Sequence, residues 1–167
     1  MLDVLVLCML LVGFASITKS LEENDHSEFV TPSGPSCKAT IHGAEWPSDN
    51  EWAELNRLVG GRLLKPLPAA APCHIGSPVY DAQNCETIRK NWKSSEFHAH
   101  HPTSTLWTNV NGNSCDAEAN STCTGSGFPV YVLNATSVQD IALAVKWAQQ
   151  RNIRINIKST GHDFLGR

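Results

Sequence analysis

The stretch that decides the fold is Val130–Arg167, VYVLNATSVQDIALAVKWAQQRNIRINIKSTGHDFLGR. Its first part, residues 131–133, is an apolar run with β-branched and aromatic character that follows Pro129, and it predicts a strand. Its later part, residues 153–158, alternates isoleucine with Arg, Asn and Lys. That period of two predicts a second strand with one buried face.

A helix is predicted between the two strands. Ser137 stands three residues before Asp140, which resembles a capping box with Asp in the usual Glu position. Apolar residues then recur at helical spacing, at Val138, Ile141, Ala142, Val145 and Ala148. Strand, helix and strand predict a βαβ unit with a right-handed crossover, whose closing loop offers backbone amides to a ligand. No Gly-x-Gly-x-x-Gly precedes the helix, which argues against a Rossmann-type nicotinamide site.

The closing loop, KSTGHDFLGR from Lys158 to Arg167, resembles the flavin-attachment loop of FAD-linked oxidoreductases of the berberine-bridge-enzyme type. The match is to their fungal branch, within the vanillyl-alcohol-oxidase-like group that has a PCMH-type FAD domain. The resemblance implies that His162 is bonded covalently to the 8α-methyl group of the flavin ring. It also implies that small residues let the main chain approach the pyrophosphate. The further candidate cofactor-binding residues are Ser159, Thr160, Gly161, Asp163 and Gly166.

The residue types of this loop suit covalent flavin attachment on chemical grounds alone, apart from the resemblance. A neutral imidazole is a competent nucleophile near neutral pH, and a neighbouring glycine permits close backbone approach to a phosphate. Taken alone, a Gly-His-Asp tripeptide is more often a turn than a cofactor site. The βαβ context and the longer match favour the cofactor site.

A second segment carries the same resemblance. Ser48 to Glu51 forms a capping box, and Gly60-Gly61 ends the helix that follows. Its apolar positions are Trp52, Leu55, Leu58 and Val59. The family pattern of Trp-Pro-Ser, Glu-Trp, Leu-Asn and Gly-Gly-Arg-Leu is matched between residues 46 and 63. Fungal members usually carry cysteines where this chain has Ala39 and Glu45, which places one N-terminal bridge in doubt.

The first 20 residues predict a secretory signal peptide, because a nearly continuous apolar run over residues 2–12 is followed by small residues. The n-region is atypical, with Asp3 and no Lys or Arg, and a retained N-terminal anchor is the alternative. The run is shorter than the roughly 20 apolar residues of a membrane span. Sequons at Asn120 and Asn134 predict glycosylation and agree with a secreted or secretory-lumen protein.

Five cysteines lie outside the predicted signal peptide, so at least one lacks an intramolecular partner. We favour the short-range pairs Cys73–Cys85 and Cys115–Cys123, which leaves Cys37. The competing zinc site is disfavoured because no Cys-x-x-Cys pair exists. Three histidines in Phe97–Pro102 also suggest a metal, but His98 and His100 would point to opposite sides of an extended chain. We therefore predict no metal site and expect a surface or interdomain loop there.

The remaining segments complete the organisation. Residues 21–36 are polar and rich in Pro and Ser, which predicts a flexible lead, and Cys85–Trp92 predicts a short helix. Residues 103–127 are rich in Asn, Ser, Thr and Gly and predict a long loop. A net charge of −3 without a basic run argues against nucleic acid as a partner. No Ser/His/Asp or paired-carboxylate arrangement suggests a hydrolase.

We therefore expect an α+β fold, the N-terminal part of a PCMH-type FAD-binding domain with a βαβ unit at its C-terminal end. The expected segments are a signal peptide (1–20), a lead (21–36), a disulfide-containing helical and loop segment (37–127), and the start of the FAD domain (128–167). We expect the catalytic groups beyond Arg167, so that the chain is truncated and inactive alone.

The resemblance implies an FAD-linked oxidase that takes a small-molecule alcohol or alkaloid-type substrate and reoxidises its flavin with molecular oxygen. A role in fungal secondary metabolism, such as the chanoclavine-forming step of ergot alkaloids, is one candidate. The alternative from another class is a small secreted, disulfide-containing binding domain without a cofactor.

Overall fold

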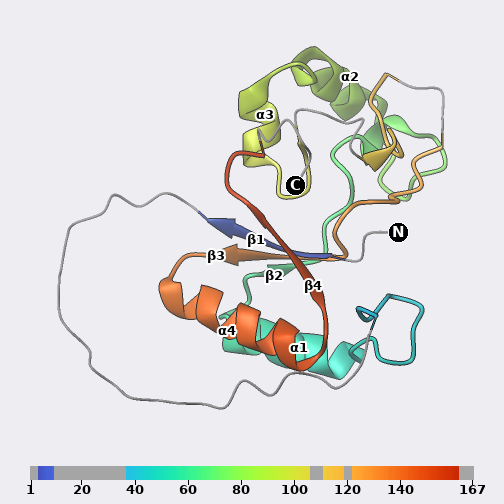
Figure 1. Ribbon diagram of the computed structural model, residues 1–167. Helices are drawn as coiled ribbons and strands as arrows, with labels where there is room; N and C mark the ends of the chain where they lie inside the picture. Colours follow the sequence, from blue (N-terminus) through green and yellow to red (C-terminus); the bar gives the residue numbers. More distant parts are fainter. Residues whose placement is uncertain (1–3, 10–36, 106–110, 119–121, 162–167) are drawn as a thin grey trace, which may run out of the picture.

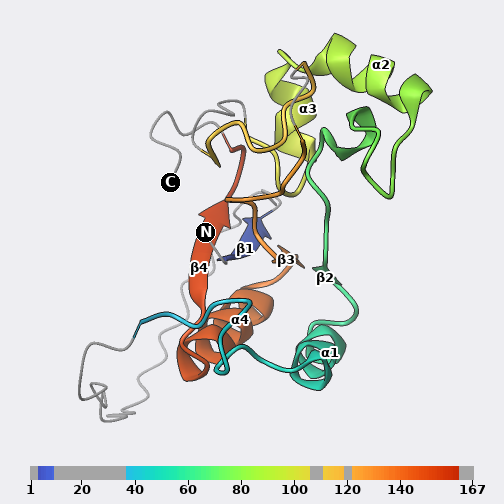
Figure 2. The same cartoon turned by 90° about the vertical axis from the view of Figure 1, so that its right-hand side faces the viewer.

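The computed structural model describes residues 4–9, 37–105, 111–118 and 122–161. Helices and strands are mixed along the chain, which confirms the α+β class. A small sheet lies across the middle of the molecule (Figure 1). Two helices lie on one side of it, and a second group of helices and loops lies on the other (Figure 2).

The sheet has four strands in the order β2-β3-β1-β4. The strands are β1 (Val4–Met9), β2 (Leu63–Leu64), β3 (Tyr131–Ala135) and β4 (Arg154–Lys158). β1 pairs in parallel with both β3 and β4, whereas β2 pairs antiparallel with β3. The two predicted strands of the βαβ unit are therefore present, with β1 between them.

The N-terminal strand bears on the predicted signal peptide. Within residues 1–20 the structure describes only the segment of β1, whose register aligns Leu5 with Tyr131 and with Ile155. Removal of a signal peptide would take this middle strand away from β3 and β4. A chain that has lost its signal peptide cannot have this strand order, which contains β1. The signal peptide stays a prediction.

Helices α1 (Asp49–Leu58) and α4 (Val138–Gln150) lie side by side on one side of the sheet (Figure 1). Both begin with the predicted capping boxes. The Ser48 hydroxyl accepts from the Glu51 amide and the Glu51 carboxylate accepts from the Ser48 amide; Ser137 and Asp140 do the same for α4. Such caps satisfy backbone N–H groups that the first helical turn leaves without partners.

The main core lies between these two helices and the sheet. Trp52 of α1 is 3% exposed and stacks on Tyr131 of β3, with ring centroids 4.0 Å apart. The ring of Trp147 on α4 lies 4.6 Å from that of Trp52. Leu55 and Leu133 are fully buried beside them. The Glu-Trp motif near the N-terminus therefore packs directly on the βαβ unit.

The Gly-Gly-Arg-Leu motif makes a second connection to the βαβ unit. Gly60 and Gly61 have positive φ angles of 64° and 80°, which end α1 and turn the chain into β2. The next residue, Arg62, pairs with Asp140 of α4 at 2.5 Å. Because Asp140 is also the capping-box residue, one carboxylate joins α4 to the N-terminal segment.

The other group of elements contains a 3₁₀ turn η1 (Ala71–Cys73), helix α2 (Ala82–Asn91) and helix α3 (Ser95–His100). The bridges Cys73–Cys85 and Cys115–Cys123 hold it together, as predicted, and Cys37 is a free, exposed thiol. Its small core contains Ala70, Ile88, Cys115 and Ala117. The predicted helix over Cys85–Trp92 is α2, which starts three residues earlier and is capped by the Asp81 side chain.

Two expectations were wrong. The histidine cluster is not an extended surface loop, because residues 95–100 form α3 and His98 is 1% exposed. The strict alternation of β4 also fails, since Lys158 is buried at 8% exposure while Ile157 is 54% exposed. Among the described residues, no helix has the length and apolar character needed to cross a membrane.

Candidate cofactor-attachment site

The predicted attachment loop begins where β4 ends. Ser159 and Thr160 are exposed there, and the Thr160 amide donates to the Ser159 hydroxyl at 2.7 Å. In sheets with parallel strands, ligands bind outside the carboxyl ends of the strands. The described part of the loop is at such an end. His162, Asp163 and Gly166 lie outside the described residues.

Gly161 is held in a conformation that needs glycine. Its φ angle is 72°, in the left-handed region that side chains disfavour. A Cβ atom at this position would lie 2.7 Å from Cε of Lys158 and 3.2 Å from the carbonyl oxygen of Ser104. The loop therefore turns tightly against two neighbours just before His162.

Lys158 lies beneath this turn. Its ammonium group donates to the carbonyl oxygens of His98 at 2.9 Å and Ala99 at 3.2 Å, and also to that of His101. These carbonyls belong to the C-terminal end of α3, where helical carbonyls lack intrahelical partners and the helix dipole favours a cation. The end of β4 is thereby tied to the end of α3 (Figure 2).

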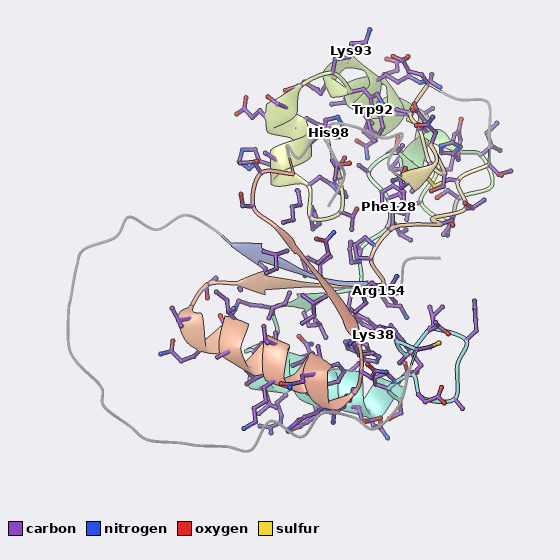
Figure 3. All side chains as sticks on the ribbon, in the orientation of Figure 1. Lys38, Trp92, Lys93, His98, Phe128 and Arg154 are labelled. Atoms are coloured by element: carbon purple, nitrogen blue, oxygen red, sulfur yellow. A yellow bond between two sulfur atoms is a disulfide. The ribbon has the colours of Figure 1, made fainter. Side chains whose placement is uncertain are left out.

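His98 extends this polar connection into the helical group. One ring nitrogen, Nε2, lies 2.6 Å from the Trp92 carbonyl, and Nδ1 lies 2.5 Å from the Ser104 hydroxyl. Burial, opposed by the bond to Trp92 and assisted by the Lys158 charge, holds the pKa of His98 below its ordinary value. A neutral ring then donates from Nε2 and accepts at Nδ1. Figure 3 shows His98 beside Trp92 in this group.

His101 is the second titratable neighbour of Lys158. Its Nδ1 lies 3.3 Å from both the amide nitrogen and the hydroxyl oxygen of Thr103. Burial, with smaller contributions from the Lys158 charge and from His98, lowers the pKa of His101 to about 4. His101 is therefore uncharged at neutral pH, and the lowered pKa of His98 likewise favours its neutral ring.

The described residues fit a dinucleotide phosphate at this loop. The glycine turn and the exposed Ser159 and Thr160 leave the main chain open to approach at the carboxyl end of β4. The Lys158 ammonium donates to α3 carbonyls and is not directed at a phosphate. The described donors for a phosphate are therefore the amides and hydroxyls of the loop.

The other predicted sites have different outcomes. Asn134 is half-buried within β3, and Asn120 lies outside the described residues. His74 lies within 4.8 Å of both sulfurs of Cys115 and Cys123, but these are joined in a disulfide and offer no thiolate for zinc. A cavity of about 740 Å³ lies beside the Cys73–Cys85 bridge, and no described residue of the attachment loop lines it.

Sequence reasoning missed Lys158, His98 and Ser104 as a connected group. The period-two pattern assigned Lys158 to the polar, solvent-facing side of its strand. The sequence held no local signal of this group, because the contacts of Lys158 join residues about 60 positions apart.

Comparison with known proteins shows which proteins this chain is similar to. No family model matches the chain. The VAO-type flavoprotein oxidase VAO615 of Thermothelomyces thermophilus is 40% identical over 138 residues, which are 80% of this chain and 24% of that protein. The FAD-linked oxidoreductase patO of Aspergillus clavatus is 35% identical over 133 residues, which are 78% of this chain and 23% of patO.

Solved structures agree with these relatives. The VAO-type flavoprotein MtVAO615 from Myceliophthora thermophila C1 matches with a TM-score of 0.74 and 38% identity over 78% of this chain and 25% of its own. MtVAO713 from the same organism matches with a TM-score of 0.72 and 33% identity, over 80% of this chain and 24% of its own. The chain thus spans about a quarter of the length of the relatives it matches. By sequence and by fold, this chain is therefore homologous to a segment of fungal VAO-type flavoproteins and FAD-linked oxidoreductases.

Proposed function

We propose that this chain carries the flavin-attachment segment of an FAD-linked oxidase, with His162 as the covalently joined residue. The observation that supports this most is the loop Ser159–Gly161, turned by a glycine at the carboxyl end of β4 directly before His162. A covalent attachment needs a reacting group held in position, and the Gly161 turn is the last described part of the chain before His162. Asp163 and Gly166 are proposed to complete the loop around the cofactor.

The proposed activity is the oxidation of a small-molecule alcohol, or of a carbon next to an amine, with molecular oxygen as the final acceptor. Bound flavin would supply the electron transfer, and this chain would supply its anchoring and orientation. The residues that bind the substrate and act on it are proposed to lie outside this chain. An alkaloid precursor, including the chanoclavine-forming substrate, is one candidate among small molecules of fungal secondary metabolism.

The proposed location is the secretory pathway or the outside of the cell. Two disulfides in the described residues support an oxidising compartment. The signal peptide over residues 1–20 and glycans on Asn120 and Asn134 are parts of the same proposal.

The test is whether flavin stays with the protein after denaturation. The chain would be fused after Arg167 to the remaining part of VAO615, expressed, and precipitated with acid. A yellow precipitate, together with oxygen consumption on candidate alcohols, would support the proposal. A folded, colourless fusion would contradict it and would favour the second candidate, a secreted disulfide-containing binding domain. We further propose that residues 21–167 alone do not turn over substrate, because the catalytic groups are proposed to lie outside them.

A further inference from the structure

The position of His162 depends on what supports Gly161. The described residues nearest to a Cβ at Gly161 are Lys158 and Ser104. Lys158 comes from the end of β4, and Ser104 follows α3 in the helical group. The attachment loop therefore rests on two segments that are more than fifty residues apart in sequence.

Lys158 has two separate contacts at this place. Its aliphatic stem lies under Gly161, where a Cβ atom on that glycine would come within 2.7 Å of Cε. Its ammonium group is bonded to the carbonyl oxygens of His98, Ala99 and His101. A buried ammonium with three acceptors is fixed in one rotamer, because any other would leave a desolvated charge without partners. The stem is therefore fixed as well.

Ser104 is fixed through His98. The Ser104 hydroxyl bonds to Nδ1 of His98, whose Nε2 bonds to the carbonyl of Trp92 at the end of α2. His98 is 1% exposed and Ser104 is 3% exposed, so both bonds are shielded from water. The carbonyl oxygen of Ser104 then presents a second rigid neighbour to Gly161.

We propose that Lys158 is a positioning residue for the attachment loop: it ties the end of β4 to the C-terminus of α3 and fixes the surface on which Gly161 turns. This inference rests on the proposed function, because the position of Gly161 affects flavin attachment only if the next residue, His162, carries the flavin. Lys158 itself does not touch the reacting atoms. It sets where the loop leaves the sheet.

The first test measures the loop itself and needs no flavin. Lys158→Met keeps the stem and removes the charge, and Lys146→Met does the same at an exposed position on α4. Backbone ¹⁵N relaxation of the 167-residue chain would be recorded for both. We expect the order parameter of Gly161 to fall from about 0.85 to below about 0.6 in Lys158→Met only, with α1 and α4 unchanged. An unchanged Gly161, or an equal loss throughout the chain, would overturn the proposal.

The second test measures the consequence for attachment. The fusion to the remaining part of VAO615 would be made without flavin and then mixed with FAD, and the appearance of acid-stable flavin would be followed with time. Displacement of a reacting group by about 1 Å lowers a rate by about 100-fold, so we expect Lys158→Met to slow attachment by about 10- to 100-fold. Lys146→Met should match the wild type.

The outcomes separate the two ideas. If the wild-type fusion binds FAD without acid-stable attachment, the proposed function of His162 fails, and the relaxation experiment still decides the role of Lys158. If the wild type attaches flavin and Lys158→Met does so at the same rate, the positioning role is refuted while the proposed function stands.

Discussion

Replacement of Asp140 by alanine tests the connection between the N-terminal segment and the βαβ unit. The Asp140 carboxylate accepts bonds from the amides of Thr136 and Ser137 at 3.0 and 3.1 Å, and from Arg62 at 2.5 Å. Loss of a capping interaction costs about 1 kcal/mol, and loss of a hydrogen bond to a charged partner costs about 1.5–3 kcal/mol. The Arg62 side chain is 34% exposed and can be hydrated in the variant, which favours the lower end.

We therefore expect Asp140→Ala to lower the free energy of unfolding by about 2–3 kcal/mol, which corresponds to about 5–10 °C in melting temperature for a chain of this size. Urea unfolding would be followed by the fluorescence of Trp52 and Trp147, which flank the affected core. Glu54→Ala is the matched control, because Glu54 pairs with Arg57 on the exposed face of α1. Equal shifts of the urea midpoint in the two variants would show that the Asp140 bonds contribute no more than an exposed ion pair.

Further predictions concern pH, the glycine turn and the N-terminus. The pKa of His101 falls from an ordinary 6.5 to about 4 on folding, so its contribution to stability is present above pH 6.5 and is lost as the pH falls toward 4. That loss reaches about 2 kcal/mol at pH 5, and His101→Asn should flatten the curve of unfolding free energy against pH between about 7 and 5. Gly161→Ala should cost about 1–2 kcal/mol in urea unfolding, because of its φ angle and its contact with Lys158, whereas Gly76→Ala, with open space around it, should not. Edman sequencing of secreted material should find an N-terminus near Leu21, and a sequence that starts at Met1 would contradict the signal peptide.

Much of the fold follows from local patterns in the sequence. The capping boxes at Ser48 and Ser137 and the apolar spacing after them predict α1 and α4, because helix starts depend on residues within one turn. The pairing of Cys73 with Cys85 also follows from proximity along the chain. Features that depend on neighbouring residues were therefore predictable.

Features set by distant partners were not. Lys158 is buried because α3 presents carbonyls to it from about 60 residues earlier, and nothing in the alternation of β4 signals that. The histidine segment 98–101 was expected to be extended, although its helix is capped by Ser94 and held by the bond from His98 to Trp92. The place of β1 between β3 and β4 likewise depends on pairing across the whole chain.

The candidate site divides in the same way. The loop after β4 was predicted from its motif and its strand, and the structure describes it as far as Gly161. Its support by Lys158 and Ser104 became visible only in three dimensions. The motif thus names the residues expected to face the cofactor, and the fold shows what holds the start of the loop in place.

Acid precipitation of the VAO615 fusion with His162→Ala tests directly whether His162 anchors the flavin. The matched control is His100→Ala, since His100 is exposed on α3. We expect the wild type and His100→Ala to keep flavin in the precipitate, whereas His162→Ala releases it to the supernatant. Acid-stable flavin on His162→Ala would show that another residue anchors the flavin.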